Sequence, residues 1–296
     1  MSRAPSPGTI REACLQASSF LKAKGTGQDP GRVALLLLEH VTGWSRTELL
    51  NRWDERFPNE LREAWQQALD RKAAGEPVQY ITGEQEFYGR AFKVTPDVLI
   101  PRPETELLVE RIARLGGKLW PVGAPLAADI GTGSGAIAVT LSLLQPAWRL
   151  VATDISQAAL AVAAENAARL GAAGRIRFLC GDLLAPLAEH GIAADILVSN
   201  PPYIPSGEVA GLQPEVRDYE PAQALDGGED GLVFYRRMLD GLSSLPKPPR
   251  LIGFETGIGQ AGTVAALIRD LPYGYETEVV KDLAGIERHV VAWQPD

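Results

Sequence analysis

Hydrophobic residues recur at helical spacing through residues 1–82, and no stretch there alternates as a β-strand would. The apolar run "VALLLLEHV" follows Asp29-Pro30, a typical N-cap with proline at the first helical position, and it stops at Gly43. A second run, "PNELREAWQQALDRKAAGEP", alternates apolar and charged residues at the same spacing. These patterns predict a small helical bundle without an obvious catalytic constellation, so we expect it to serve as a binding module.

The pattern changes in residues 83–104, which we predict to be a linker between two domains. The segments "QEFY" and "AFKV" flank Gly89-Arg90, which predicts a β-hairpin. The stretch "PRPETELLVERIARLGG" then predicts a helix that begins near Pro103 and ends at Gly116-Gly117.

Strand-like and helix-like segments alternate throughout residues 105–296. The predicted strands are "PLAADIG", "WRLVATDI", "RIRFLCGD", "ADILVSN" and "RLIGFETG", with helices between most of them, one of which is capped by Ser156. The final stretch, "YETEVVKDLAGIERHVVAWQ", predicts a terminal pair of strands. The sequence therefore predicts an α/β domain with a doubly wound, Rossmann-like parallel sheet and an antiparallel edge.

A glycine-rich turn follows the first strand of that domain. Gly131, Gly133 and Gly135, with Thr132 and Ser134 between them, lie directly before a helix. Glycine lets the backbone approach a ligand closely, and the helix N-terminus offers free N–H groups. The spacing also satisfies the dinucleotide fingerprint, so the turn by itself leaves the ligand open.

Polar residues end the next three strands as well. Asp154 follows the second strand, Asp182 the third and Asn200 the fourth. Carboxyl ends of parallel strands meet at one edge of the sheet, where ligands of this fold class bind. An acid at the position of Asp154 suits ribose hydroxyls, so the joint placement predicts a nucleoside cofactor.

These motifs together resemble class I S-adenosylmethionine-dependent methyltransferases and, more closely, the HemK/PrmC family of release factor glutamine methyltransferases. The matching stretches are "EPVQYITGEQEFYG", "VLIPRPETELLVE", "DIGTGSGAIAV", "SNPPYIP", "YEPAQALDGGEDGL" and "DLAGIERHVV". The resemblance implies S-adenosyl-L-methionine as cofactor and the glutamine of the Gly-Gly-Gln motif of peptide-chain release factors as substrate. It also implies that the helical domain and the hairpin dock the release factor.

Cofactor-binding and catalytic positions carry over from that resemblance residue by residue. It assigns Gly131, Thr132, Gly133, Ser134, Gly135, Asp154, Asp182, Leu183 and Asn200 to the cofactor. Leu183 stands where some relatives have an aromatic residue, so adenine stacking would be weaker here. Arg102 and Glu104 lie in a family motif without an assigned role, and an ion pair that anchors the linker would equally explain them.

The sequence Asn200-Pro201-Pro202-Tyr203 is the proposed catalytic and substrate-binding corner. A primary amide nitrogen is a poor nucleophile because its lone pair is delocalised into the carbonyl. The Asn200 side-chain oxygen and the Pro201 carbonyl can each accept one N–H of that amide, which fixes its orientation. The prolines hold the corner rigid, and Tyr203 can lie against the flat amide and exclude water. No general base is required, because the methylated nitrogen becomes cationic and then loses a proton easily.

The same corner could hold the exocyclic amine of adenine, so other functions stay open. A DNA adenine-N6 methyltransferase is one, although the net charge of −8 and the pI of about 5.1 disfavour direct nucleic-acid binding. Glutamine methylation of a ribosomal protein is a second. A dinucleotide-dependent oxidoreductase and a non-catalytic nucleoside-binding protein are further alternatives.

Cysteine and histidine usage bounds the remaining chemistry. Two distant cysteines, Cys14 and Cys180, exclude a disulfide framework or a CxxC metal site, and three scattered histidines favour no metal. The N-terminal "MSRAPSPGTI" lacks the apolar core of a signal peptide, and "VALLLL" is too short to span a bilayer. We therefore expect a cytoplasmic monomer with no membrane contact.

Overall fold

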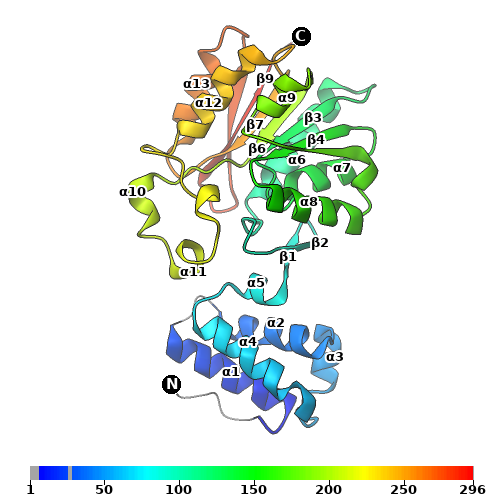
Figure 1. Ribbon diagram of the computed structural model, residues 1–296, viewed down its shortest axis with the longest axis vertical. Helices are drawn as coiled ribbons and strands as arrows, with labels where there is room; N and C mark the ends of the chain where they lie inside the picture. The colour runs from blue at the N-terminus through cyan, green and yellow to red at the C-terminus, as the bar shows by residue number, and fades with distance from the viewer. Residues whose placement is uncertain (1–6, 26–28, 296) are drawn as a thin grey trace. The chain divides into compact units, whose positions relative to one another are not determined.

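The computed structural model describes residues 7–25 and 29–295, which divide into two units. One unit comprises the chain up to Glu84 together with Gln213–Tyr219, and the other comprises Gln85–Leu212 and the residues from Glu220 onward (Figure 1). Residues 1–6, part of the stretch predicted to lack an export signal, lie outside the described residues. Within the described ranges, no helix is both long enough and apolar enough to cross a membrane.

Amphipathic helices build the first unit around one apolar core. They are α1 (Ile10–Lys24), α2 (Pro30–Thr42), α3 (Arg46–Asn51), α4 (Arg62–Ala73) and α5 (Val78–Thr82), with a 3₁₀ turn at Asn59–Leu61. Asp29 caps α2 by accepting from the Arg32 N–H, and Gly43 ends it with a φ of 69°, as predicted. Leu21 and Leu37 are fully buried in this core.

The short helix α11 (Pro214–Arg217) belongs to this first unit although it is remote in sequence. Its Glu215 forms an ion pair with Lys72 of α4 at 2.5 Å, and the Tyr219 hydroxyl donates to the Ala74 carbonyl at 3.0 Å. Lys72 is only 2% exposed, and a buried ammonium requires such a partner. Nothing in the sequence of residues 213–219 marks this excursion.

A β-hairpin follows α5, with strands β1 (Glu84–Phe87) and β2 (Arg90–Lys93). The prediction of a hairpin is confirmed, but the turn lies one residue earlier than expected, at Tyr88 and Gly89. Both residues have positive φ angles of 52° and 69°, which two-residue turns matched to strand twist require.

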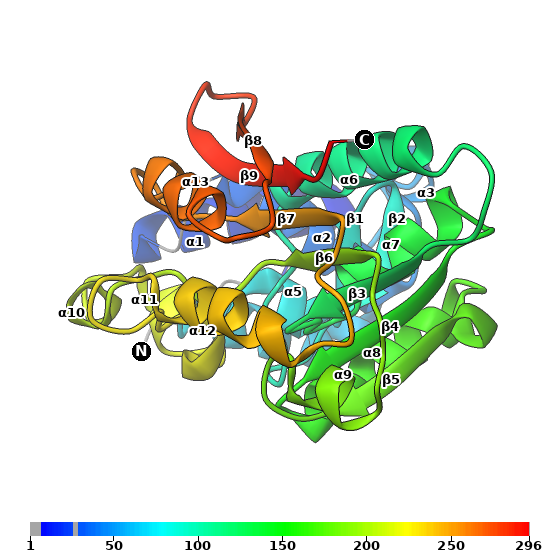
Figure 2. The same ribbon diagram turned by 90° about the horizontal axis from the view of Figure 1, so that it is seen from above.

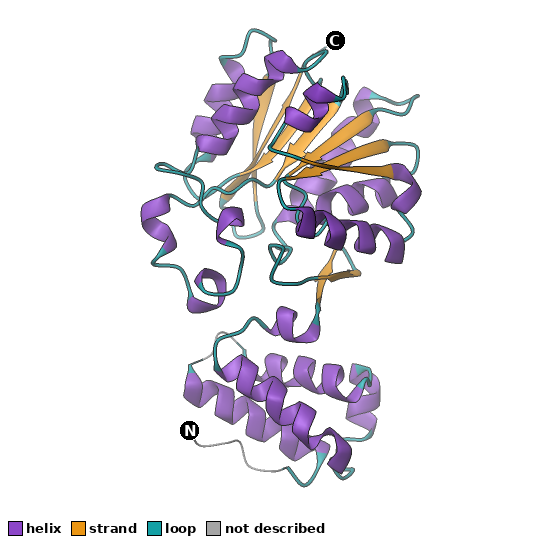
Figure 3. Cartoon of the chain, viewed as in Figure 1, coloured by secondary structure: helices purple, strands orange, loops and turns teal. Residues whose placement is uncertain are grey.

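The second unit is built on a seven-stranded sheet with the order β5-β4-β3-β6-β7-β9-β8. Figure 3 shows the strands of this unit in orange among purple helices. The strands are β3 (Leu126–Ile130), β4 (Arg149–Asp154), β5 (Ile176–Cys180), β6 (Ile196–Ser199), β7 (Leu251–Glu255), β8 (Glu276–Lys281) and β9 (Glu287–Trp293). The first five are parallel, whereas β9 is antiparallel to both neighbours. The predicted doubly wound sheet with an antiparallel edge is confirmed.

Alternate residues of the strands face two separate cores, because side chains of a strand point to opposite faces of a sheet. Ala127 and Ile196 enter the cluster beneath α6 (Thr105–Leu119), α7 (Ala136–Leu144) and α8 (Gln157–Arg169). Ala128 and Leu197 enter the other, beneath α9 (Ala185–Glu189), α12 (Val233–Gly241) and α13 (Ala261–Arg269). Figure 2 shows the sheet from above with helices on both sides.

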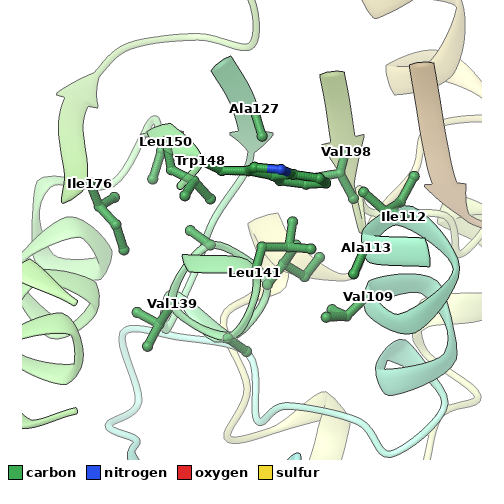
Figure 4. Close-up of a cluster of buried hydrophobic side chains, with 14 of the residues drawn as sticks. Val109, Ile112, Ala113, Ala127, Val139, Leu141, Trp148, Leu150, Ile176 and Val198 are labelled. Carbon is green, nitrogen blue, oxygen red and sulfur yellow. The ribbon is translucent and has the colours of Figure 1, made fainter. Parts of the chain in front are cut away.

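Helix α6 differs from its predicted end, because it continues through Gly116 and Gly117 to Leu119. A side chain at Gly116 would lie only 2.3 Å from the indole of Trp148. Trp148 is buried between the sheet and the helices in the first core cluster (Figure 4). Glycine is present here to let the helix approach that ring, not to end the helix.

Candidate functional site

A cavity of about 330 Å³ lies at the carboxyl ends of β3, β4 and β6 and beside the loop after β5. Most residues proposed from the sequence line it, namely Gly131, Thr132, Gly133, Ser134, Asp154, Asp182, Leu183, Asn200, Pro201 and Pro202. Within the described part of the chain, Gly135 and Tyr203 are not among the lining residues. The structure thus brings both predicted groups, for cofactor and for substrate, to one space.

The glycine loop (residues 131–135) has a backbone that glycine adopts far more readily than other residues. Gly131, Gly133 and Gly135 have φ angles of 70°, 54° and 81°. A side chain on Gly135 would lie 3.1 Å from Ala163 of α8, so this glycine allows close helix packing. Nothing lies within 4 Å of the equivalent position on Gly131 or Gly133, so both leave room at the cavity wall.

The buried carboxylate of Asp129, which the sequence analysis did not select, is hydrogen-bonded to the glycine loop. Asp129, 1% exposed at the end of β3, accepts from the Thr132 hydroxyl at 2.6 Å and from the Ala138 N–H at 3.1 Å. Its Oδ1 has no hydrogen-bond partner among residues 7–25 and 29–295. Burial raises the pKa of Asp129 to about 7.

Asp154 ends β4 and connects that strand to the loop. Its carboxylate accepts from the Gly133 N–H and the Ser156 N–H, both at 2.9 Å. Burial raises the pKa of this carboxyl group, and the backbone hydrogen bonds oppose the shift. Because a carboxylate offers about four acceptor positions, Asp154 retains capacity for a ligand in the cavity.

The loop after β5 supplies Asp182 and Leu183. Asp182 forms an ion pair with Arg237 of α12, a cavity-lining residue that no motif in the sequence indicates. Leu183 has a φ of 49°, which is an outlier for a large side chain. Such strain is concentrated at ligand sites, and here it lies at the cavity wall.

The Asn-Pro-Pro-Tyr corner (residues 200–203) begins where β6 ends. The Asn200 side-chain NH₂ donates to the Thr105 hydroxyl at 3.3 Å, and that hydroxyl donates to Glu255 Oε2 at 2.6 Å. Thr105 is the first residue of α6, and Glu255 is the last residue of β7. The bond to Thr105 uses the amide NH₂ of Asn200 and leaves its Oδ1 available as an acceptor.

Gly227 and Gly231, downstream in the sequence, lie close against the backbone of this corner. The Ile204 N–H donates to the Leu225 carbonyl at 3.1 Å, and the Gly227 N–H donates to the Ile204 carbonyl at 2.7 Å. A side chain at Gly227 would lie 2.8 Å from the Pro202 carbonyl oxygen, and one at Gly231 would lie 2.3 Å from the Tyr203 carbonyl oxygen. The "DGGEDG" segment therefore needs glycine for backbone contact with the corner.

Tyr203 packs beside the cavity and joins the second core cluster. Its carbonyl accepts from the Gln260 side chain at 2.8 Å, and its ring lies 3.2 Å from the position of a side chain at Gly257. Burial, and then the nearby Glu255, raise the pKa of Tyr203 to about 12. The phenol is therefore protonated at neutral pH and is no base.

Arg102, which had no assigned role, lies at the cavity and pairs with Glu220 at 2.6 Å. The second Glu220 oxygen accepts from the Ile100 N–H at 3.4 Å, and the Glu220 residue is 5% exposed. These two contacts link the motif "IPRPE" (residues 100–104) to Glu220. Such a pairing across 118 residues leaves no local signal in the sequence.

Comparisons with known proteins identify the family. Family models match residues 12–83 (PrmC N-terminal domain) and residues 104–212 (Methyltransferase small domain). A release factor glutamine methyltransferase from Moorella thermoacetica is 44% identical over 97% of this chain and 99% of its own length. The chain belongs to the release factor glutamine methyltransferase family. A Bacillus subtilis family member is 42% identical over 96% of this chain and 97% of its own length.

Solved structures confirm the fold at lower identity. The hMettl16 catalytic domain, crystallised with the MAT2A 3′UTR hairpin 6, aligns with a TM-score of 0.56 at 18% identity over 73% of this chain and 80% of that chain. The N-terminal domain of human METTL16 in complex with SAH aligns with a TM-score of 0.52 at 15% identity over 95% of each chain. The resemblance to the methyltransferase family seen in the sequence is confirmed.

Proposed function

We propose that this protein transfers a methyl group from S-adenosyl-L-methionine to the side-chain amide nitrogen of the Gly-Gly-Gln glutamine in peptide-chain release factors. One observation carries the proposal: Asn200, Pro201 and Pro202 line the same cavity as residues 131–134 of the glycine loop and Asp154. Curated relatives that span nearly the whole chain are named for this activity.

The residues around the cavity fit the proposed cofactor. Gly131 and Gly133 leave open space at the wall, Asp154 keeps acceptor capacity, and Leu183 offers an apolar surface. When bound, the cofactor supplies an electrophilic methyl group with a good leaving group. The protein therefore has to position the nucleophile and exclude water, and it has no need to generate a strong base.

Two acceptors at the corner suit a planar NH₂ group. We assign the Asn200 side-chain oxygen to one N–H of the substrate amide and the Pro201 carbonyl to the other. Holding both hydrogens in place favours pyramidalisation of the nitrogen as its lone pair is used. Pro201 and Pro202 fix the backbone before substrate binds, which lowers the entropy lost on binding. The Tyr203 ring is assigned to the flat face of the amide.

The helical unit is the proposed docking element for the release factor. Its core consists of packed hydrophobic side chains, and the residues proposed for cofactor binding and catalysis all belong to the other unit. We further propose that the protein is a cytoplasmic monomer that binds no nucleic acid directly. The net charge of −8 supports the absence of nucleic-acid binding, and a translation-factor substrate supports the cytoplasmic location.

Mass spectrometry of a release factor before and after treatment tests the proposed function. The full-length protein, S-adenosyl-L-methionine and a purified release factor should yield one added methyl group, localised by peptide fragmentation to the glutamine of Gly-Gly-Gln. A release factor in which that glutamine is replaced by alanine is the matched control and should stay unmodified.

Duplex DNA and a ribosomal protein fraction serve as competing substrates with labelled cofactor. Label in DNA with none in the release factor would overturn the proposal and favour adenine methylation. Label confined to ribosomal protein would keep the chemistry and change the substrate.

A further inference from the structure

The orientation of the Asn200 side chain decides whether the proposed amide clamp can work. An asparagine side chain has a donor end and an acceptor end of nearly equal shape, so packing alone barely distinguishes its two flipped forms. With Oδ1 toward the substrate, Asn200 accepts an N–H. With the NH₂ toward the substrate, Asn200 presents N–H donors to the substrate NH₂ group, which is itself a donor and offers no acceptor. Some contact must select the first form.

Thr105 makes that contact from the N-terminal end of α6. The Asn200 NH₂ lies 3.3 Å from the Thr105 hydroxyl, which lies 2.6 Å from Glu255 Oε2. A hydroxyl has one hydrogen to donate, whereas a carboxylate oxygen can only accept. The short bond to Glu255 therefore takes the Thr105 hydrogen and leaves lone pairs directed to Asn200. Only the NH₂ end of Asn200 can satisfy them.

Glu255, at the end of this relay, is buried and anchored through its backbone. Glu255 is 2% exposed, and its backbone carbonyl accepts from the buried Tyr235 hydroxyl at 2.7 Å. His289, which is fully buried on β9, lies 3.8 Å from Glu255 Oε2. A hydrogen-bonded group held in a low-dielectric interior keeps its direction firmly, because reversing it would leave a buried group without a partner.

We propose that Thr105 and Glu255 are positioning residues which set the flip state of the Asn200 amide, so that its oxygen faces the substrate glutamine. The relay acts through Asn200 and needs no contact between Glu255 and either ligand. This inference rests on the proposed function, since it explains how the amide clamp acquires two acceptors.

Thr105→Val tests the relay, because valine keeps the shape of threonine and removes the hydroxyl. The kcat for release factor methylation should fall about tenfold to a hundredfold, the size expected for a misdirected buried hydrogen bond. The dissociation constant for S-adenosylmethionine and the KM for the release factor should change by less than about threefold. Thr105→Ser restores the hydroxyl and should recover most of kcat.

Thr140→Val is the matched control in the same unit. Thr140 lies on α7, is fully buried, and its hydroxyl has no partner within residues 7–25 and 29–295. This change should leave kcat and thermal stability nearly unaltered. A loss of kcat in Thr105→Val with an unchanged melting temperature then reports positioning, not unfolding.

A substrate-independent readout separates this inference from the proposed function. In the free protein, the side-chain NH₂ resonances of Asn200, assigned by their loss in Asn200→Ala, should shift in Thr105→Val and remain in place in Thr105→Ser. Unshifted resonances, unchanged kcat, a parallel loss of cofactor affinity, or no rescue by serine would each overturn the relay. A wild-type protein that does not methylate the release factor while the resonances shift as expected would overturn only the proposed function.

Discussion

Two buried carboxylates each hold a threonine that lines the cavity. Asp129 is the penultimate residue of β3 and Glu255 is the last residue of β7, and each accepts a hydrogen bond of 2.6 Å from a threonine hydroxyl. Both are 2% exposed or less. Asp129 holds the glycine loop on the proposed cofactor side, and Glu255 holds Thr105 on the proposed substrate side.

The two networks differ in how far they reach along the chain. Thr132 lies 3 residues from Asp129, so the glycine loop is fastened by its own immediate sequence. Thr105 lies 150 residues from Glu255 and 95 residues from Asn200. The Asp129–Thr132 contact is therefore local, whereas the Gly133 N–H reaches Asp154, 21 residues away at the end of the neighbouring strand β4. The contacts on the substrate side span longer stretches of the chain and require the sheet to be assembled.

The largest expected effect breaks the substrate side and spares the cofactor side. Asn200→Ala should lower the rate of release factor methylation about a thousandfold, because it removes an acceptor aimed at the reacting nitrogen. Cofactor affinity, measured by isothermal titration, should fall by less than about fivefold. Comparable losses in both measurements would place Asn200 in the cofactor site alone.

Asp129→Asn tests the carboxylate of the cofactor side through the pH dependence of stability. The pKa of Asp129 rises from 3.8 to about 7 on folding, so the folded state binds more protons than the unfolded state between about pH 4 and 7. The free energy of unfolding should therefore fall as pH rises through this window, by on the order of 3 kcal/mol, and level off above it. Asparagine cannot ionise.

Denaturant titrations at several pH values provide the measurement for that change. In Asp129→Asn, the free energy of unfolding should lose the part of its pH dependence that comes from Asp129. The asparagine oxygen should still accept the hydrogen bond from Thr132. An identical pH profile in both proteins would show that Asp129 is ionised in the folded state throughout.

Gly131→Ala should lower cofactor affinity about tenfold. Its φ of 70° is strained for alanine by about 1–2 kcal/mol, and the added methyl group would project from the cavity wall. Gly171→Ala is the matched control, since Gly171 has a φ of 78° with equally open surroundings and does not line the cavity. Thermal melting should report similar destabilisation in both, whereas titration should show weaker binding only for Gly131→Ala.

Tyr203→Phe should have the smallest effect, below about threefold in kcat, because a phenol with a pKa of about 12 does no proton transfer near neutral pH. Tyr203→Ala should impair methylation more than cofactor binding, since the ring is assigned to the substrate amide. Rate profiles from pH 7 to 10 should be parallel in wild type and Tyr203→Phe. A tenfold loss in the phenylalanine variant would assign the hydroxyl a role in the reaction.

Local chemistry explains what could be predicted from the sequence. The caps at Asp29 and Ser156, the alternation of strands and helices, and the glycine loop are each set by residues within a few positions of one another. The carboxyl ends of parallel strands meet by geometry, so the gathering of Asp154, Asp182 and Asn200 also followed. The end of helix α6 differs from the prediction because Gly116 packs closely against Trp148, which lies just before β4.

Long-range packing decided the rest. Four features depend on segments that only the fold brings together. They are the burial of Asp129, the ion pair of Arg102, the close backbone contacts of Gly227 and Gly231, and the hydrogen bond from Asn200 to Thr105. The sequence by itself determined that Asn-Pro-Pro-Tyr closes a core strand with an amide and two rigid prolines. Only the tertiary structure decided which end of that amide is held, because the hydroxyl and carboxylate that hold it come from α6 and β7.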